Sequence, residues 1–310
     1  MTTFSIAIHG GAGTILRNSL SADAERNYRE ALDAALIAGE SVLHRNGSAL
    51  DAVTAAVISL EDCPLFNAGK GAVYTHEGGH EMDASVMRGD TLQAGAVAGI
   101  HSVRNPVLLA RSIMERSEHV LLSGRGAEQF AREQQLVFEN EDYFHNDFRK
   151  QQWQDALREG RIQLDHTAGD EKKFGTVGAV ARDRAGNLAA ATSTGGMTNK
   201  RYNRIGDSPV IGAGTYANNS TCAISCTGHG EYFIRAVVAY DISCLMEYKG
   251  WSLKQACEKV VMDKLVKFGG EGGLIAVDHL GNIDLPFNSA GMYRGWSLEN
   301  QGRGVAIYRD

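Results

Sequence analysis

The sequence predicts an α+β fold in which two antiparallel sheets are layered with helices. Apolar residues make up 43% of the 310 residues, glycine is abundant (36) whereas proline is scarce (4), and strand-like segments alternate with amphipathic helical ones. A chain of this length and composition can bury a sizeable core, and its glycines favour tight turns. Strands, two helices and further strands in succession are typical of sheets packed against helices.

The first 60 residues predict a strand followed by two helices. A short buried strand spans residues 4–8, and we expect the glycine loop 9–13 to end it. Apolar residues then recur at helical spacing up to about Arg45. Ser48 and Asp51 resemble a capping box, which predicts the start of a second helix.

The middle of the chain is more irregular. Residues 69–99 are rich in glycine and strand-like in pieces. Helical patterns follow at residues 106–115, 127–134 and 151–158. The polar, weakly patterned stretch at about 159–175 is interpreted as an exposed linker.

The second half predicts strands around another pair of helices. Residues 177–181 and 188–194 flank a turn at Gly186 and predict a hairpin. We expect further strands at 222–226, 274–277 and 283–287, and helices at 231–248 and 252–268. The hairpin would bring Thr194 close to Thr176.

Charge and hydropathy argue against several classes of protein. The net charge is −6 with both signs spread along the chain, so no basic surface for nucleic acid is expected. No apolar run approaches the roughly 18 residues that a membrane helix needs, and the first residues do not resemble a signal peptide. We therefore expect a cytoplasmic protein.

The cysteines fit the same expectation. An odd number without a framework spacing favours a reducing compartment over a disulfide scaffold. Two of them lie four positions apart on one face of a predicted strand, where core packing is a better interpretation than a metal site. The five are Cys63, Cys222, Cys226, Cys244 and Cys257.

The segment from His76 to His80 matches the zinc-protease pattern H-E-x-x-H. That chemistry requires both histidines on one face of a helix, with the glutamate beside a bound water. Gly78 and Gly79 disfavour a helix. We therefore predict a glycine-rich surface turn, and a zinc hydrolase stays a remote alternative.

The loop His9–Gly13 (HGGAG) resembles a backbone nest for an anion or the oxyanion loop of an esterase. A serine esterase would also need a G-x-S-x-G nucleophile motif, which the sequence lacks. We interpret the loop as a tight structural turn close to the active site.

Thr176 stands between a charged stretch and an apolar strand. A threonine hydroxyl is a poor nucleophile without an adjacent base. Cleavage of the chain before Thr176 would supply one, because a free α-amine has a pKa near ~8. Gly175 permits the strained backbone that an internal N→O acyl shift needs. The alternative is a β-branched residue that simply begins a strand.

Hydroxyl and charged side chains follow at the ends of later strands. Thr194 ends the strand that pairs with the one after Thr176, and the loop after Thr227 combines a hydroxyl with glycine N–H groups, which suits an oxyanion hole. Arg204 and Asp207 could bind the α-carboxylate and α-ammonium of an amino acid. A surface ion pair is the alternative for these two.

Seven motifs make the resemblance to a family specific. The chain contains, in this order, HGGAG, CPLFNAGKGAV, GTVGAVA, TSTGGMTNK, RIGDSP, GAGTYA and SCTGHGE. With these motifs it resembles, from residue 4 to residue 310, the bacterial and plant-type isoaspartyl peptidases/L-asparaginases, which are N-terminal nucleophile hydrolases with a four-layer αββα sandwich.

The resemblance implies a precursor that cuts itself between Gly175 and Thr176. An α subunit (1–175) and a β subunit (176–310) would together form one domain, and two αβ units would assemble. The substrates would be small molecules, isoaspartyl dipeptides and L-asparagine. No organic cofactor and no catalytic metal are expected.

The resemblance also implies roles for individual residues. Thr176 would be nucleophile and, through its amine, general base, with Thr194 activating it and Asn67 at the pocket edge. Thr227 and Gly228 would form the oxyanion hole. Substrate would bind at Arg204, Ile205, Gly206, Asp207, Thr227, Gly228, His229 and Gly230. A structural sodium ion would bind the backbone carbonyls of Leu60, Glu61, Cys63, Phe66, Ala68 and Lys70.

Two other functions stay open from the sequence. A glycosylasparaginase-like amidase would need room for a sugar beyond the amide. A non-catalytic homologue would recognise aspartate without turning it over.

Overall fold

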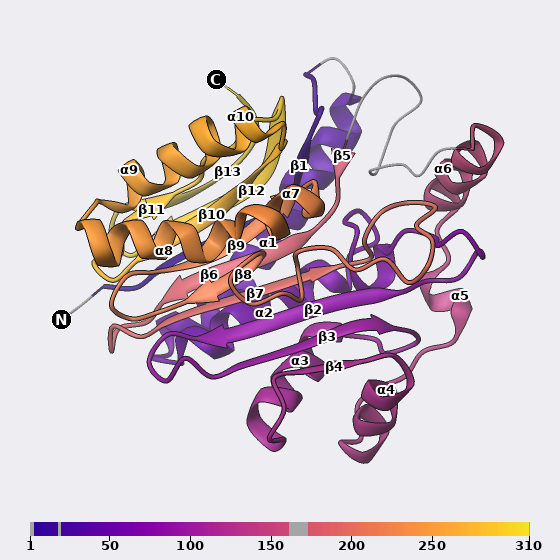
Figure 1. Cartoon of the computed structure of the whole chain (residues 1–310), viewed down its shortest axis with the longest axis horizontal. Helices are drawn as coiled ribbons and strands as arrows, with labels where there is room; N and C mark the ends of the chain where they lie inside the picture. Colours follow the sequence, from indigo (N-terminus) through magenta and orange to yellow (C-terminus); the bar gives the residue numbers. More distant parts are fainter. Residues whose placement is uncertain (1–2, 18–19, 161–172, 310) are drawn as a thin grey trace.

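The fold of the chain is taken from a computed structural model that describes residues 3–17, 20–160 and 173–309 (Figure 1). Helices and strands are mixed along the chain, so the predicted α+β class is confirmed. No helix among these residues combines the length and the apolar character that crossing a membrane requires.

Within the described residues, the larger of two sheets has nine strands. Their order across the sheet is β13-β12-β1-β6-β7-β2-β3-β4, and β5 pairs with β1 off this path. Among the strands described for this sheet, only β3 and β4 pair in parallel. The strands are β1 (Ser5–Gly13), β2 (Met82–Arg88), β3 (Ala94–Ile100), β4 (Leu121–Ser123), β5 (Lys173–Phe174), β6 (Val177–Arg182), β7 (Leu188–Thr194), β12 (Gly291–Leu298) and β13 (Gly302–Tyr308).

The smaller sheet is antiparallel and runs in the order β11-β10-β9-β8. Its strands β9 and β10 lie against β1, β6 and β7 of the larger sheet. The four strands are β8 (Thr215–Ala217), β9 (Cys222–Gly228), β10 (Gly272–Asp278) and β11 (Ile283–Asp284).

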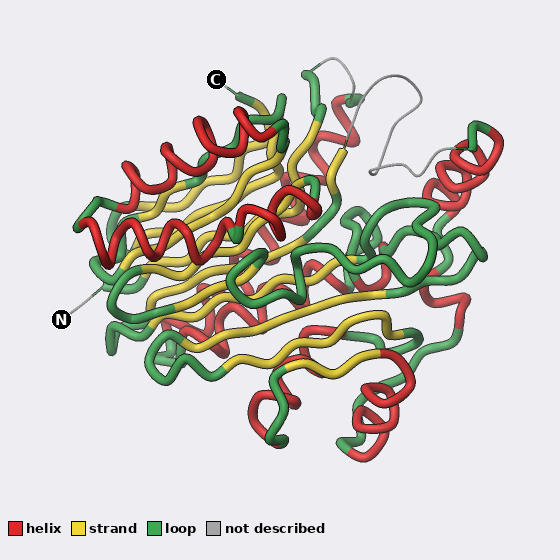
Figure 2. The backbone as a smooth tube through the Cα atoms, in the orientation of Figure 1, coloured by secondary structure: helices red, strands yellow, loops and turns green. Residues whose placement is uncertain are grey.

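Helices cover the outer faces of the two sheets (Figure 2). The larger sheet is covered by α1 (Ala22–His44), α2 (Ala49–Glu61) and α3 (Pro106–Arg116). The smaller sheet is covered by α8 (Val238–Lys249) and α9 (Leu253–Cys257). Peripheral helices are α4 (Gly124–Glu133), α5 (Glu141–Phe144) and α6 (Asp147–Arg158).

Strand β1 shows why both faces of the larger sheet are apolar. Ile6 and Ile8 belong to the core shared with α1–α3, whereas Ala7, between them, belongs to the core shared with the smaller sheet and α8–α9. Successive side chains on a strand point to opposite faces. The strand therefore reads as a continuous apolar run, because each of its faces is buried.

The glycine segment 9–13 is part of β1, so the predicted tight turn is wrong. Pairing with β12 continues through it, with a register shift between His9 and Gly11. A Cβ at Gly10 would lie 2.3 Å from the Phe66 ring, and Gly11 has a φ of 113°. Glycines let the strand bulge at a close approach instead of ending it.

The predicted linker at about 159–175 is only partly visible, because residues 161–172 lie outside the described residues. Its last part is no linker. Lys173 and Phe174 form β5 and pair with Gly13 and Ala12 of β1. The pairing brings Gly175 to the edge of the glycine segment of β1.

The predicted helix 231–248 is broken into α7 (Gly230–Ala236) and α8. Val237 between them is left-handed, with φ 50° and ψ 49°. The break lets the N–H groups of Ala239 and Tyr240 donate to the carbonyls of Ala213 and Gly212, at 3.3 and 2.8 Å. These tertiary contacts outweigh the local helical preference of the segment.

The remaining predicted elements are confirmed with small shifts. Ser48 accepts a hydrogen bond from the N–H of Asp51 at the start of α2, and Ser252 and Gln255 form the predicted capping box at the start of α9. The helix at 252–268 contains a π segment, η2 (Glu258–Lys264), before α10 (Leu265–Phe268). β11 is shorter than predicted, and β4, α5, β8, β12 and β13 were not predicted from the sequence.

We expect Gly95→Ala to lower the free energy of unfolding by about 1–3 kcal/mol, since overpacking a rigid contact costs this much. A Cβ at Gly95 in β3 would lie 2.0 Å from the Ala110 carbonyl oxygen of α3. Gly126→Ala is the control, because nothing lies within 4 Å of its Cβ and it sits in α4. Chemical denaturation measures both, and equal effects would contradict the prediction.

Candidate active site

The β6–β7 hairpin brings Thr176 and Thr194 together. Thr176 directly precedes β6, and Val177 pairs with Ser193. The Thr176 hydroxyl donates to the Thr194 Oγ1 at 3.2 Å, and both side chains are buried. The proximity expected from a turn at Gly186 is confirmed.

The carbonyl of Gly175 faces two hydrogen-bond donors. Thr194 Oγ1 and Asn67 Nδ2 each donate to its oxygen at 2.9 Å. Asn67 is itself held in place, because it donates to Gly196 O at 2.8 Å and accepts from Val73 N at 3.0 Å. Two preorganised donors on one carbonyl oxygen are an arrangement that stabilises a developing negative charge.

Asp207 carries a buried carboxyl and borders the same cavity as Gly175. The residue is 4% exposed, and its Oδ2 has no hydrogen-bond partner among the described residues. Burial raises the pKa of Asp207 to about 7, although the nearby Arg204 guanidinium opposes the shift. A buried carboxylate with a free oxygen is suited to receive a cationic group.

Arg204 is paired with Glu231 of α7. Its Nε and Nη2 donate to the two carboxylate oxygens, each at 2.8 Å. His229 Nε2 lies 3.1 Å from the same carboxylate. Burial alone would raise the pKa of Glu231, but the hydrogen bonds from His229 and Arg204 hold it well below its usual range. Glu231 was not among the site residues predicted from the sequence, although its charge and its place after the glycine loop are signals for such a role.

These groups surround a cavity of about 20 Å³, which is room for about one water molecule. Gly175 itself forms part of the wall, so the uncleaved chain fills the space next to Thr176. The cavity is lined by Gly175, Thr176, Thr194, Gly196, Met197, Arg204, Gly206, Asp207, Ser208 and Gly228.

The other predicted substrate residues border this cavity or lie away from it. Thr227 is buried and accepts a hydrogen bond from Ala12 N at 3.3 Å. A Cβ at Gly230 would lie 2.8 Å from Asp207 Oδ1, so this glycine lets α7 approach the carboxyl. His229 is partly exposed, and Ile205 is 42% exposed. Neither of these two side chains lines the cavity.

The loop predicted to bind sodium is closely wound. Gly69, in the short helix η1 (Gly69–Gly71), has a φ of 50°, and a Cβ there would lie 2.5 Å from Glu61 O. A Cβ at Gly71 would lie 2.0 Å from Phe66 O. Backbone carbonyl oxygens thus approach both positions so closely that only glycine fits there. The Glu61 side chain points elsewhere, to Ser193 and the start of α3.

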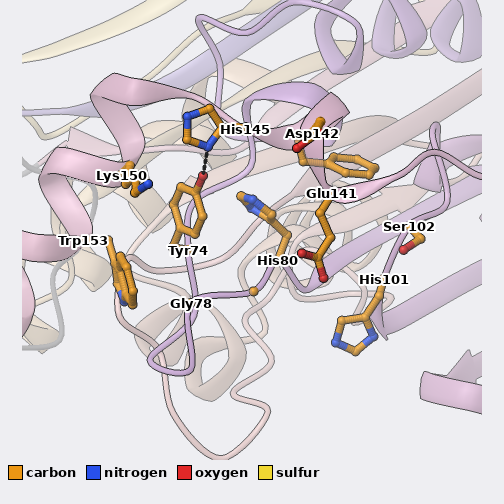
Figure 3. Close-up of a pocket in the computed structure, with 12 residues that line it drawn as sticks. Tyr74, Gly78, His80, His101, Ser102, Glu141, Asp142, His145, Lys150 and Trp153 are labelled. Carbon is orange, nitrogen blue, oxygen red and sulfur yellow. Dashed lines mark hydrogen bonds between the residues drawn. The ribbon is translucent and has the colours of Figure 1, made fainter.

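Residues 76–80 form a turn, as predicted, and not the helix that a zinc protease needs. His76 Nδ1 lies 2.8 Å from Asn199 Oδ1, and His80 Nδ1 lies 3.2 Å from Val73 O. His80 borders a separate cavity of about 270 Å³ beside Tyr74 and His145 (Figure 3). In the described part of the chain, no three His, Cys, Asp or Glu side chains are grouped to hold a metal ion.

Cys222 and Cys226 lie in the core, as expected. Both are fully buried on β9, and burial raises the pKa of each thiol. All five cysteines are free thiols.

Known proteins match nearly the whole chain. A family model described as Asparaginase matches residues 2–307. The chain is 58% identical to an isoaspartyl peptidase of Salmonella typhimurium, with 98% of each chain covered. It is 56% identical to an isoaspartyl peptidase of Escherichia coli, covering 98% of this chain and 96% of that protein. It is 40% identical to an isoaspartyl peptidase/L-asparaginase of Xenopus laevis, covering 92% and 89%.

The mixed fold and these similarities assign the chain to the N-terminal nucleophile hydrolases. The chain belongs to the asparaginase family that the model describes. Coverage from end to end shows that the likeness is not confined to a single motif.

We expect Asp207→Asn to change how stability depends on pH. Because its folded pKa is raised from 3.8 to about 7, the stability that Asp207 contributes is fully present below pH 3.8 and is lost as the pH rises through 7. The slope is at most about 1.4 kcal/mol per pH unit. Calorimetric melting midpoints from pH 5 to 8 should therefore fall for the wild type relative to Asp207→Asn. Parallel curves would contradict this.

Proposed function

We propose that this chain is a self-processing amidohydrolase that cleaves β-aspartyl (isoaspartyl) dipeptides and L-asparagine and releases L-aspartate. The observation that supports it most directly is the setting of the Gly175–Thr176 peptide. A threonine hydroxyl adjoins it, two donors face its carbonyl oxygen, and a buried carboxyl and an arginine line the same cavity. Relatives named isoaspartyl peptidase share more than half of the sequence.

In the self-cleavage step, Thr176 Oγ1 attacks the carbonyl carbon of Gly175 and forms a C–O bond. Thr194 and Asn67 stabilise the oxyanion through the hydrogen bonds that they already make to this oxygen. The C–N bond then breaks, and the hydroxyl proton ends on the departing nitrogen of Thr176. Water hydrolyses the resulting ester, which leaves a Gly175 carboxylate and a free Thr176 amine and hydroxyl.

The free amine then serves as the base of the catalytic reaction. Its pKa near ~8 leaves a useful neutral fraction at neutral pH. It takes the hydroxyl proton as Thr176 attacks the side-chain carbonyl of the substrate, and it returns the proton to the leaving amine. The oxyanion is stabilised at Thr227 and Gly228. Water hydrolyses the acyl-enzyme and releases aspartate.

The substrate is oriented by two opposite charges. The α-carboxylate would bind Arg204 and the α-ammonium would bind the free oxygen of Asp207, which places the side-chain carbonyl toward Thr176. Arg204 is already engaged by Glu231. To bind the substrate carboxylate, Arg204 must therefore contact it while still paired with Glu231 or release Glu231.

Further properties follow from family membership. We propose the four-layer αββα sandwich of the N-terminal nucleophile hydrolases, with residues 1–175 and 176–310 as the two subunits of one domain and two αβ units in the assembly. Strands β6 and β7 support the shared domain, because they pair between β1 and β2 of the first half. We also propose sodium on the carbonyls of residues 60–70, and a cytoplasmic location consistent with the free thiols.

We expect Thr176→Ala to remain a single band near 33.4 kDa on a denaturing gel, with activity reduced at least about a thousandfold. The change removes the hydroxyl that attacks the Gly175 carbonyl in self-cleavage and the substrate carbonyl in catalysis. Thr176→Ser keeps a hydroxyl and should yield two fragments and measurable turnover. A single wild-type band that retains full activity would disprove self-cleavage.

A second experiment distinguishes the proposed activity from the two alternative functions. Aspartate release should be seen with an isoaspartyl dipeptide and with L-asparagine, because both place an amide on the β carbonyl. An α-aspartyl dipeptide is the control and should not be cleaved. Turnover of a β-N-glycosylated asparagine at a comparable rate would favour the glycosylasparaginase alternative, and binding of aspartate without any turnover would favour the non-catalytic one.

A further inference from the structure

His9 of β1 contacts the backbone of Thr176, the proposed nucleophile. Its Nδ1 lies 3.0 Å from the carbonyl oxygen of Thr176, and its ring is fully buried. It does not line the cavity. Gly178, its partner in the β1–β6 register, makes room for the ring, because a Cβ there would lie 2.5 Å from His9 Nε2. The sheet is therefore built to hold an imidazole against Thr176.

The hydrogen bond to Thr176 O requires one particular tautomer of the His9 ring. A carbonyl oxygen can only accept, so the hydrogen bond exists only when Nδ1 carries the proton. Burial lowers the pKa of His9 to about 3, so the ring is neutral at ordinary pH. Its Nε2 must then accept a hydrogen bond. The group opposite Nε2 is the hydroxyl of Ser225, at 2.9 Å.

Ser225 begins a chain of buried hydroxyls that leads to the substrate loop. Its Oγ lies 2.6 Å from Thr192 Oγ1, which accepts from Thr215 Oγ1 at 2.5 Å. Thr215 and the carbonyl oxygen of Ser208 are both within reach of Ser85 Oγ, at 2.7 and 2.6 Å. Ser208 directly follows Asp207. The chain thus joins the carbonyl of the nucleophile to the loop that holds the buried carboxyl.

The hydrogen-bonded series from Thr176 O to Ser208 O has fewer protons than contacts. From Thr176 O to Ser208 O there are six contacts in series, and both ends can only accept. A neutral imidazole and four hydroxyls supply five protons. One contact must therefore lack a proton. When Ser225 donates to Nε2, the ring can donate from Nδ1 to Thr176 O, and when Nε2 carries the proton and donates to Ser225, the hydrogen bond to Thr176 is lost.

We propose that His9 is a positioning residue, whose Nδ1–H holds the backbone of Thr176 while the hydroxyl chain beginning at Ser225 donates to Nε2 and so selects this tautomer. The carbonyl that His9 holds belongs to the residue that carries both the nucleophilic hydroxyl and the amine. Fixing it fixes their direction toward the substrate carbonyl. Ionisation of the ring plays no part.

Two amide substitutions separate the ring nitrogens. The side-chain amide of His9→Asn reaches the position of Nδ1 and can donate to Thr176 O, whereas that of His9→Gln reaches the position of Nε2. We expect His9→Gln to lower kcat and the rate of self-cleavage at least about tenfold with KM little changed, since one oriented hydrogen bond is lost. His9→Asn should retain most of both rates. Intact mass measures cleavage, and steady-state kinetics with an isoaspartyl dipeptide measures turnover.

Ser225→Ala tests the hydroxyl chain, with Ser243→Ala as a matched control. Ser243 forms an equally buried hydroxyl pair with Thr221, at 2.6 Å, which has no contact with His9. We expect only Ser225→Ala to lower kcat, by about three- to tenfold, as for one neutral hydrogen bond.

The tautomer can be observed directly. Nitrogen NMR of the histidine-labelled enzyme, with the His9 signals assigned by their loss in His9→Asn, should show a proton on Nδ1 and no titration from pH 5 to 8. A proton on Nε2 would overturn the proposal. So would equal losses of kcat in His9→Asn and His9→Gln, because these would indicate packing alone.

This inference rests on the proposed function, since it takes Thr176 as the nucleophile. The two fail differently. If Thr176→Ala turned over substrate at the wild-type rate, the proposed function would be wrong. If Thr176→Ala were inactive but His9→Gln were fully active and fully cleaved, only the role of His9 would be wrong.

Discussion

The pairing of β6 with β7 in the middle of the larger sheet is the constraint on which the site depends. It places the residue that precedes one strand beside the last residue of the other, which is how Thr176 and Thr194 come within 3.2 Å. Both strands are flanked on each side by other strands and packed on both faces, which holds in place the backbone next to the two threonines. The preorganisation of the reacting groups is therefore a property of the sheet and not of a flexible loop.

Burial gives the charged groups of the site different properties. Asp207 lacks a partner for one oxygen, and the loss of water raises its pKa. Glu231 is also partly buried, but hydrogen bonds from Arg204 and His229 keep it ionised. The site thus contains the Arg204–Glu231 ion pair and, at Asp207, a carboxyl with one oxygen that has no hydrogen-bond partner among the described residues. A zwitterionic amino acid is the kind of ligand that matches this pattern.

The two halves of the chain share one core. β1 from the first half pairs with β6 from the second, and β7 pairs with β2. Cutting the backbone before Thr176 would leave all of these pairings in place, so the fragments would stay together without a covalent link. The same cut would also enlarge the small cavity, because Gly175 forms part of its wall and would be free to move once the peptide bond is broken.

Local patterns in the sequence were sufficient to predict the hairpin around Gly186, the helix starts at Ser48 and Ser252, and the family that the ordered motifs indicate. Such signals act over a few residues, where spacing and capping decide the conformation. The pairing of strands in the folded chain was needed to show that HGGAG continues β1, and that His9 contacts Thr176, 167 positions away in the sequence. Pairings of this kind depend on the order of strands in the sheet, and a linear pattern does not specify that order.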